Sequence, residues 1–310
     1  MRGRHGFVRS LVPLGAAATL LVTSPAPLAA QRSSVSAPPS SARAAGTAGG
    51  GTTSVQIGLD VRRDRLHYRF TNPSTFDTPA PVPHAFDQRY VADNVWATVT
   101  LRYTAGVRWE TRVGATPQRT ATGEDYDTFF DPGGVVIVAG TTGGVSARAW
   151  RFSQRAEVGR RRFRLVAGYR LQIDHFAFQL GHKTVTRNGT TLQAFDVTSP
   201  ETTSSQLHEV FAGLEASRTL GGGWRASLEG DVSPASVGRL AIQLPEKYPG
   251  QTLVYGAKAF GASTRVTLAR GGRWPVEVSV DAGRLWSYGS SNVVSRDQLG
   301  VSVSAGRAWR

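Results

Sequence analysis

The stretch WRASLEGDVS, residues 224–233, alternates between apolar or small residues and polar ones over ten positions. This period of two predicts a β-strand with one apolar and one polar face. The same alternation recurs in VEVSVDAG (276–283), FRLVAGYRLQI (163–173) and VWATVTLRY (95–103). Most of these runs are longer than the five or six residues of an average strand. They match the roughly 9–11 residues with which a tilted strand crosses a bilayer.

The joins between such segments alternate in length along the chain. We expect ten strands, at residues 54–71, 93–103, 107–116, 146–158, 161–180, 206–219, 223–234, 252–269, 274–288 and 295–310. Short joins at 104–106, 159–160, 220–223 and 270–273 alternate with mostly longer ones at 72–92, 117–145, 181–205, 235–251 and 289–294. Short periplasmic turns and long outer loops are typical of outer-membrane barrels.

The sequence therefore predicts an all-β fold, a ten-stranded antiparallel transmembrane β-barrel over residues 54–310 in a bacterial outer membrane. Trp274 and Trp286 are spaced to mark the two membrane interfaces. A soluble β-sandwich or a lipocalin-like barrel would also alternate, but it has no reason to collect its long loops at one end. One feature departs from the expected pattern. Outer-membrane strands commonly finish in an aromatic residue, whereas here Arg310 follows Trp309 as the final residue.

The first fifty residues predict export. Arg2, Arg4 and Arg9 precede a short apolar run and the small pair Ala29-Ala30, so residues 1–30 are expected to be a signal peptide. A retained membrane anchor is the alternative, but the apolar run is short for one. Residues 31–53 are rich in Ser, Ala, Gly and Pro, and we expect a flexible segment there.

Composition excludes several kinds of site. The chain has no cysteine, so disulfides and thiolate metal sites are excluded. Its formal net charge is +14, which raises the possibility of a nucleic-acid partner. However, the arginines are scattered along strand-like segments without a basic helix or an aromatic platform. We therefore expect no nucleic acid and place the arginines in the barrel lumen or against anionic lipid phosphates.

Two polar stretches fall in the expected outer loops. GEDYDTFFDPGG, residues 123–134, contains Asp125 and Asp127, a pair that could share a proton, position a water or bind a cation. The alternative is an Asp-rich turn before Pro132-Gly133. LPEKYPGQ, residues 244–251, is a charged loop. The histidines show no metal-ligand spacing, and the sequence predicts neither a metal nor a cofactor.

Ten strands, tall outer loops and Asp125-x-Asp127 together resemble the omptins, a family of outer-membrane endopeptidases that often cut beside basic residues. Residues 94–133 and the segment RLVAGY (164–169) are the parts most similar to that family. The resemblance covers most of residues 54–310 through short motifs. It implies a surface protein with a peptide or protein substrate where the site is active. The excess of arginine separately favours contact with outer-membrane lipid or lipopolysaccharide.

The resemblance also implies a four-residue site, in which the Asp pair faces an Asp-His dyad across a bound water. Asp125 and Asp127 match the pair, but Lys247 stands at the position of the histidine base and Pro245 at that of its aspartate. A protonated lysine cannot accept a proton. We therefore expect an omptin-like barrel with an incomplete catalytic set that acts as a surface or lipid-interacting protein. The alternative is an active endopeptidase that uses Asp125 and Asp127 with a different base.

Overall fold

A computed structural model describes the chain at residues 51–72, 84–130, 133–159, 162–197, 201–243, 250, 252–288 and 292–309. The expected signal peptide and nearly all of the expected flexible segment lie outside the described residues. In the described part, the chain forms one antiparallel sheet of eleven strands. These are β1 (Thr53–Asn72), β2 (His84–Ala105), β3 (Val107–Phe130), β4 (Val136–Gly159), β5 (Phe163–Arg187), β6 (Thr190–Val197), β7 (Thr202–Thr219), β8 (Trp224–Gln243), β9 (Leu253–Arg270), β10 (Val276–Ser287) and β11 (Val293–Trp309).

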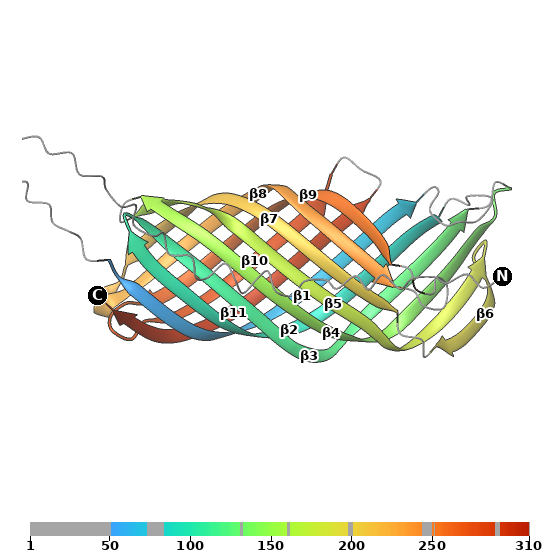
Figure 1. Cartoon of the computed structure of the whole chain (residues 1–310), viewed down its shortest axis with the longest axis horizontal. Helices are drawn as coiled ribbons and strands as arrows, with labels where there is room; N and C mark the ends of the chain where they lie inside the picture. The colour runs from blue at the N-terminus through green and yellow to red at the C-terminus, as the bar shows by residue number, and fades with distance from the viewer. Residues whose placement is uncertain are drawn as a thin grey trace, which may run out of the picture. The chain divides into compact units, whose positions relative to one another are not determined.

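Ten of these strands close into a ring. The order is β4-β3-β2-β1-β11-β10-β9-β8-β7-β5, and pairing of β4 with β5 completes the circle. The eleventh strand, β6, continues from β5 as a hairpin outside the ring. Figure 1 shows the strands tilted around a common axis, with β6 at the far end from the C-terminus. The ten-stranded antiparallel barrel expected from the sequence is confirmed.

The joins alternate as expected between two ends of the barrel, which we call the turn end and the loop end. The turn end holds the start of β1, the end of β11 and short connections such as Gly106, whose φ of 74° suits glycine. The joins after residues 130 and 243 both lie at the loop end. The expected lengths of the outer loops were wrong, because β3 runs to Phe130 and β4 begins at Val136, so most of 117–145 is strand.

The outer face of the barrel carries exposed apolar residues, as a bilayer requires. On β1, Ile57, Leu59 and Val61 are 70%, 60% and 57% exposed. The apolar belt also includes Val95, Val99, Val113, Trp150, Leu165, Val210, Leu214, Leu228, Val232, Val266, Leu268, Val280, Leu299, Val301 and Val303. Toward the loop end the belt gives way to charge, beginning with the Arg63–Asp93 pair at 3.6 Å. The described residues contain no helix long and apolar enough to cross a membrane.

Side chains fill the lumen in two layers. The ion-pair layer joins Arg62, Arg102, Arg151, Arg155, Arg164, Arg170, Arg225 and Arg296 to carboxylates of Asp60, Glu110, Glu157, Glu209, Glu215, Glu229, Asp231, Glu277 and Asp281. The aromatic layer lies nearer the loop end and is built around Leu66, Tyr68, Phe70, Phe86, Tyr90, Phe176, Phe178, Leu240 and Ile242. Many of the arginines that raise the net charge are therefore paired inside the barrel.

Candidate functional site

Asp125 and Asp127 lie on strand β3 and not in an outer loop, which corrects the expectation from the sequence. A β-bulge decides which way they point. Pro117 and Gln118 together stand opposite the single residue Arg148 of β4. Because the bulge inserts one extra residue, the inward-facing positions change from even to odd numbers. Both aspartates consequently face the lumen, where they are 1% and 0% exposed.

Asp125 belongs to a chain of hydrogen bonds that crosses the lumen from β3 to β7. Nε2 of Gln88 donates to Oδ1 of Asp125 at 2.8 Å. The hydroxyl of Thr203 donates to Oε1 of Gln88 at 3.1 Å, and the phenol of Tyr90 donates to the Thr203 hydroxyl at 2.9 Å. Tyr90 lies beyond the apolar belt. Burial, together with the negative charge of Asp125, raises the pKa of its phenol well above the ordinary value, so Tyr90 remains a donor.

The space around Asp125 is tightly packed. The ring of Tyr90 stacks on Phe176 with 4.0 Å between centroids. A Cβ atom added to Gly123, two residues before Asp125, would lie only 2.8 Å from Val145 Cγ1 and 3.1 Å from Phe178 Cζ. The carboxylate is thus held by a buried amide among aromatic rings. This arrangement holds the buried charge in place.

The histidines with described side chains on β1, β5 and β7 lie on the outer face and do not point toward Asp125. His67 contacts Asp87 at 3.1 Å, and Nδ1 of His208 lies 2.7 Å from the Tyr169 hydroxyl. His175 alternates with the buried Asp174 and Phe176, and therefore also faces outward. His84 is placed by its backbone alone, opposite Phe129 on β3.

Lys247 lies outside the described residues, as do Pro245 and Glu246. The described ends of that join, Gln243 and Thr252, are hydrogen-bonded to each other at 3.1 Å. In the ring of ten, β9 stands five strands from β3 in either direction. The join between β8 and β9 therefore begins and ends on the wall opposite the Asp pair. Whether Lys247 reaches across the lumen stays a prediction.

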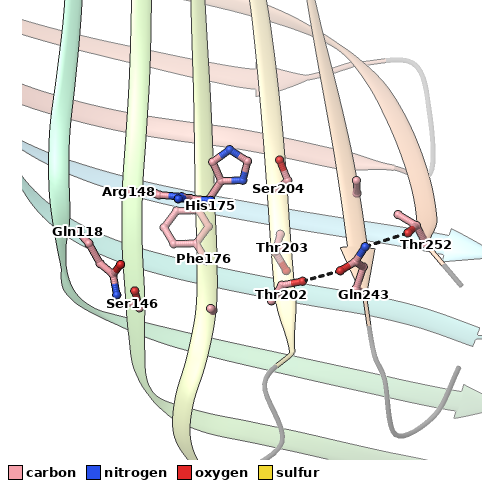
Figure 2. A pocket seen from close by; sticks show the side chains of 12 residues that line it. Gln118, Ser146, Arg148, His175, Phe176, Thr202, Thr203, Ser204, Gln243 and Thr252 are labelled. Carbon is pink, nitrogen blue, oxygen red and sulfur yellow. Dashed lines mark hydrogen bonds between the residues drawn. The ribbon is translucent and has the colours of Figure 1, made fainter. Parts of the chain in front are cut away.

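A polar pocket of about 520 Å³ opens in the barrel wall close to this cluster (Figure 2). We call it the wall pocket. It lies where β5 stops pairing with β7, after Ala177 and Thr202. Arg148, His175, Ser204 and Gln243 line it together with further hydroxyl and amide groups, and none of its lining residues is acidic. Thr203 belongs both to the wall pocket and to the hydrogen-bond chain of Asp125. No short motif in the sequence pointed to this pocket.

Comparison with solved structures identifies the architecture. The outer membrane protease OmpT from Escherichia coli superposes with a TM-score of 0.54 at 10% identity, covering 84% of this chain and 96% of OmpT. In fold, this chain is an omptin-like outer-membrane β-barrel. Ail, the attachment invasion locus protein of Yersinia pestis, gives a TM-score of 0.33 at 10% identity, covering 82% of this chain and 98% of Ail. No protein-family model and no curated protein sequence matches the chain.

Within this omptin-like barrel, the structure brings together one half of the expected site. Asp125 and Asp127 are adjacent inward-facing positions of one strand. The residues that contact Asp125 or Tyr90, namely Gln88 and Thr203, were missed by the sequence analysis because no local pattern joins them. Gln88 and Thr203 are separated by 115 positions in the sequence. Only the closing of the ring brings them into contact.

Proposed function

We propose that this protein is an outer-membrane surface barrel that lacks omptin-type peptidase activity and binds lipopolysaccharide through its outer rim. The observation that supports the first part is the buried Asp125, whose carboxylate accepts a hydrogen bond from Gln88 beneath packed aromatic rings. A hydrolytic carboxylate pair must position a water beside the scissile bond. Lys247 at the expected base position adds a second reason, because an ammonium group cannot take a proton from that water.

Cleavage of a fluorogenic peptide with a basic pair tests this proposal, using folded protein supplied with lipopolysaccharide. We expect little or no cleavage by the native protein, and incomplete recovery in Lys247→His because Pro245 offers no carboxylate to orient a new imidazole. The double variant Lys247→His with Pro245→Asp should recover more than either single variant. Robust native cleavage that is lost in Asp125→Ala would overturn the proposal and establish an active endopeptidase.

If the protein is instead an active endopeptidase, the position of His84 makes this residue a candidate for the general base. Its backbone pairs with Phe129, two residues from the Phe86–Asp127 pair on the same two strands. If the native protein cleaves the peptide, His84→Ala should abolish cleavage while Lys247→Ala leaves it unchanged. Loss of cleavage in Lys247→Ala instead would assign the base to a lysine with a depressed pKa.

The second part of the proposal rests on exposed cations above the apolar belt. Arg65, Arg69, Arg239 and Lys258 point outward from β1, β8 and β9, and no ion pair is recorded for them within the described residues. Arg148 adds a cation in the wall pocket, beside hydroxyl and amide groups that suit a sugar phosphate. Guanidinium groups bind phosphate oxygens bidentately. A lipid whose headgroup is a phosphorylated sugar matches this rim.

Lipopolysaccharide binding by the refolded barrel tests the rim at low and high salt. Binding should weaken as salt rises, because charge contacts at an exposed rim are screened. The double variant Arg148→Gln with Arg239→Gln should bind several-fold more weakly, whereas Arg218→Gln at the turn end serves as the control. Binding that is insensitive both to salt and to the rim variant would refute this part.

Export through a cleaved signal peptide completes the proposal. The Arg2/Arg4/Arg9 region and the short apolar run support cleavage near Ala30. Mass spectrometry of the membrane-extracted protein should give a mature chain that starts near Gln31. A chain that still begins at Met1 would contradict export by this route.

A further inference from the structure

Strand β6 has a free edge. Every strand of the ring pairs with a neighbour on both sides, whereas β6 pairs within the described residues with β5 alone. The residues from Thr190 to Asp196 are all exposed. Its other side thus presents a row of backbone N–H and C=O groups to solvent, at the end of the molecule away from the membrane belt (Figure 1). An exposed row of this kind is a template for one more strand.

The edge is held in position before any partner arrives. Asn188 and Gly189 form the hairpin turn with φ values of 49° and 82°, as a two-residue turn of primed type requires. Backbone N and side-chain Oδ1 of Asn188 both bond to Val136 on β4, each at 2.8 Å. His182 and Asp196 are joined across the hairpin at 3.0 Å. Little ordering entropy remains to be lost in this strand on binding.

Apart from a bulge at Leu192, where the register with β5 shifts, the edge carries few of the usual protections against pairing. Natural edge strands carry lysine, proline or inward charges that block another strand. The sequence TTLQAFDV has no proline and no lysine, and its single charge, Asp196, is engaged by His182. Leu192 and Phe195 are large apolar side chains that are 57% and 43% exposed. An exposed apolar edge is an aggregation hazard, which favours its retention as a binding surface.

The charge around the edge indicates the chemistry of its partner. Lys183 pairs through its backbone with Phe195, and Arg187 with Thr190, so two cations flank β6. No ion pair is recorded for either one among the described residues. We propose that β6 is a docking edge at which an extended, acidic segment of a partner polypeptide adds as a strand. The main-chain bonds supply affinity, and the acidic side chains meet Lys183 and Arg187. This inference goes beyond the proposed function and does not depend on it.

Binding of a labelled octapeptide of alternating Val and Glu to the full-length mature protein in nanodiscs tests the proposal. Two control peptides replace every Glu by Lys, or every Val by Pro. We expect saturable binding of the Val-Glu peptide, with at least about tenfold weaker binding of both controls, since one repels the cations and the other cannot form a ladder. Equal binding of the Val-Glu and the proline peptides would overturn the proposal.

Two sets of variants assign the binding to β6. In the charge-swap variant Lys183→Glu with Arg187→Glu, the preference should reverse from the Val-Glu to the Val-Lys peptide. Of Gln193→Pro and Ala194→Pro, one removes an N–H that points toward β5 and the other an N–H at the free edge, so we expect different losses from the two. An unchanged preference after the charge swap would refute the proposed site. Concentration-dependent dimerisation that is lost in the same variants would refute it too, because the occupant would then be a second copy.

Discussion

The carboxylate of Asp125 is buried, and its recorded hydrogen bond comes from the side-chain amide of Gln88. Asp125→Asn keeps the accepting oxygen and removes the buried charge, so we expect stability within about 1 kcal/mol of the native protein. Asp125→Ala leaves the Gln88 amide without its acceptor and should cost about 1–3 kcal/mol. Urea unfolding in lipid vesicles, followed by tryptophan fluorescence, measures both.

The exposed Asp297, which lies 3.3 Å from Arg284, provides the matched control. Asp297→Asn should change the free energy of unfolding by less than about 1 kcal/mol, because surface ion pairs contribute little. If Asp125→Asn proves as damaging as Asp125→Ala, the buried charge itself is required. That result would favour a functional carboxylate over a structural one.

Arg155 is the centre of the ion-pair layer. Its guanidinium lies within ion-pair distance of four carboxylates, those of Glu110, Glu157, Glu215 and Glu229. Arg155→Gln leaves these charges facing one another in a closed lumen, so it should destabilise the barrel by about 3–5 kcal/mol. Arg284→Gln on the outer surface is the control, with an expected cost below about 1 kcal/mol. Urea midpoints that agree for the two variants would show that the layer relaxes without Arg155.

At the scale of the strand, the bulge at Pro117-Gln118 sets the direction of the Asp pair. Deletion of Gln118 removes the extra residue, so Pro117 alone stands opposite Arg148 and Asp125 should keep facing the lumen. Deletion of Thr122, between the bulge and the Asp pair, should instead turn Asp125 to the outer face and Glu124 to the lumen while the bulge persists. Because the chain has no native cysteine, Asp125→Cys and Glu124→Cys are clean probes for a membrane-impermeant maleimide. With the bulge intact, position 124 should label and position 125 should be protected. Deletion of Gln118 should preserve this order and deletion of Thr122 should reverse it. An unchanged order after deletion of Thr122 would show that the strand compensates by losing the bulge.

The strand ends differ from the sequence prediction for a physical reason. On β1, the apolar residues Ile57 and Leu59 face outward toward lipid, whereas farther along Tyr68 and Phe70 face inward to the aromatic layer. The apolar residues therefore change from odd-numbered, outward-facing positions to even-numbered, inward-facing positions where the strand leaves the belt. β2 undergoes the same change before Val95, and the sequence prediction began this strand only at residue 93, whereas the strand begins at His84. Alternation identifies the part of a strand in contact with lipid, but not its polar continuation.

The hairpin of β5 and β6 carried a local signal that the sequence analysis did not use. Asn188-Gly189 is a strong short-range indication of a two-residue hairpin. The sequence prediction placed all of 181–205 in a loop. The contacts of Asp125 carried no such signal, because Gln88, Tyr90 and Thr203 meet only once β2 and β7 are on facing walls.

At the scale of the whole molecule, the alternation of join lengths was sufficient to predict strand number and closure. It placed the joins after β3 and β8 at one end, as the structure has them. It could not predict what fills the lumen, since pairing among many arginines and carboxylates depends on the register of ten strands. The net charge of +14 is a sum over the whole chain, and it does not reveal that arginines pair with carboxylates inside the lumen.

The two layers predict a barrel that does not conduct ions. The aromatic layer and the ion-pair layer lie one behind the other along the axis, so each alone blocks the path of a hydrated ion. In a planar bilayer, the native protein should show no steady conductance. Opening the aromatic layer by Tyr90→Ala with Phe176→Ala should leave the barrel closed, because the ion pairs remain. Conductance is expected only when Arg155→Ala and Arg151→Ala are added, so that large side chains are removed from both layers.

Refolding must be verified before this comparison is made, since thinning a packed core costs about 3–5 kcal/mol for each large side chain. A shift in gel mobility between heated and unheated samples shows that a variant is folded, and conductance is compared only among folded variants. Steady current through the native barrel would contradict a closed lumen. Current through Tyr90→Ala with Phe176→Ala would show instead that the aromatic layer alone forms the seal, and that ions pass between the paired arginines and carboxylates.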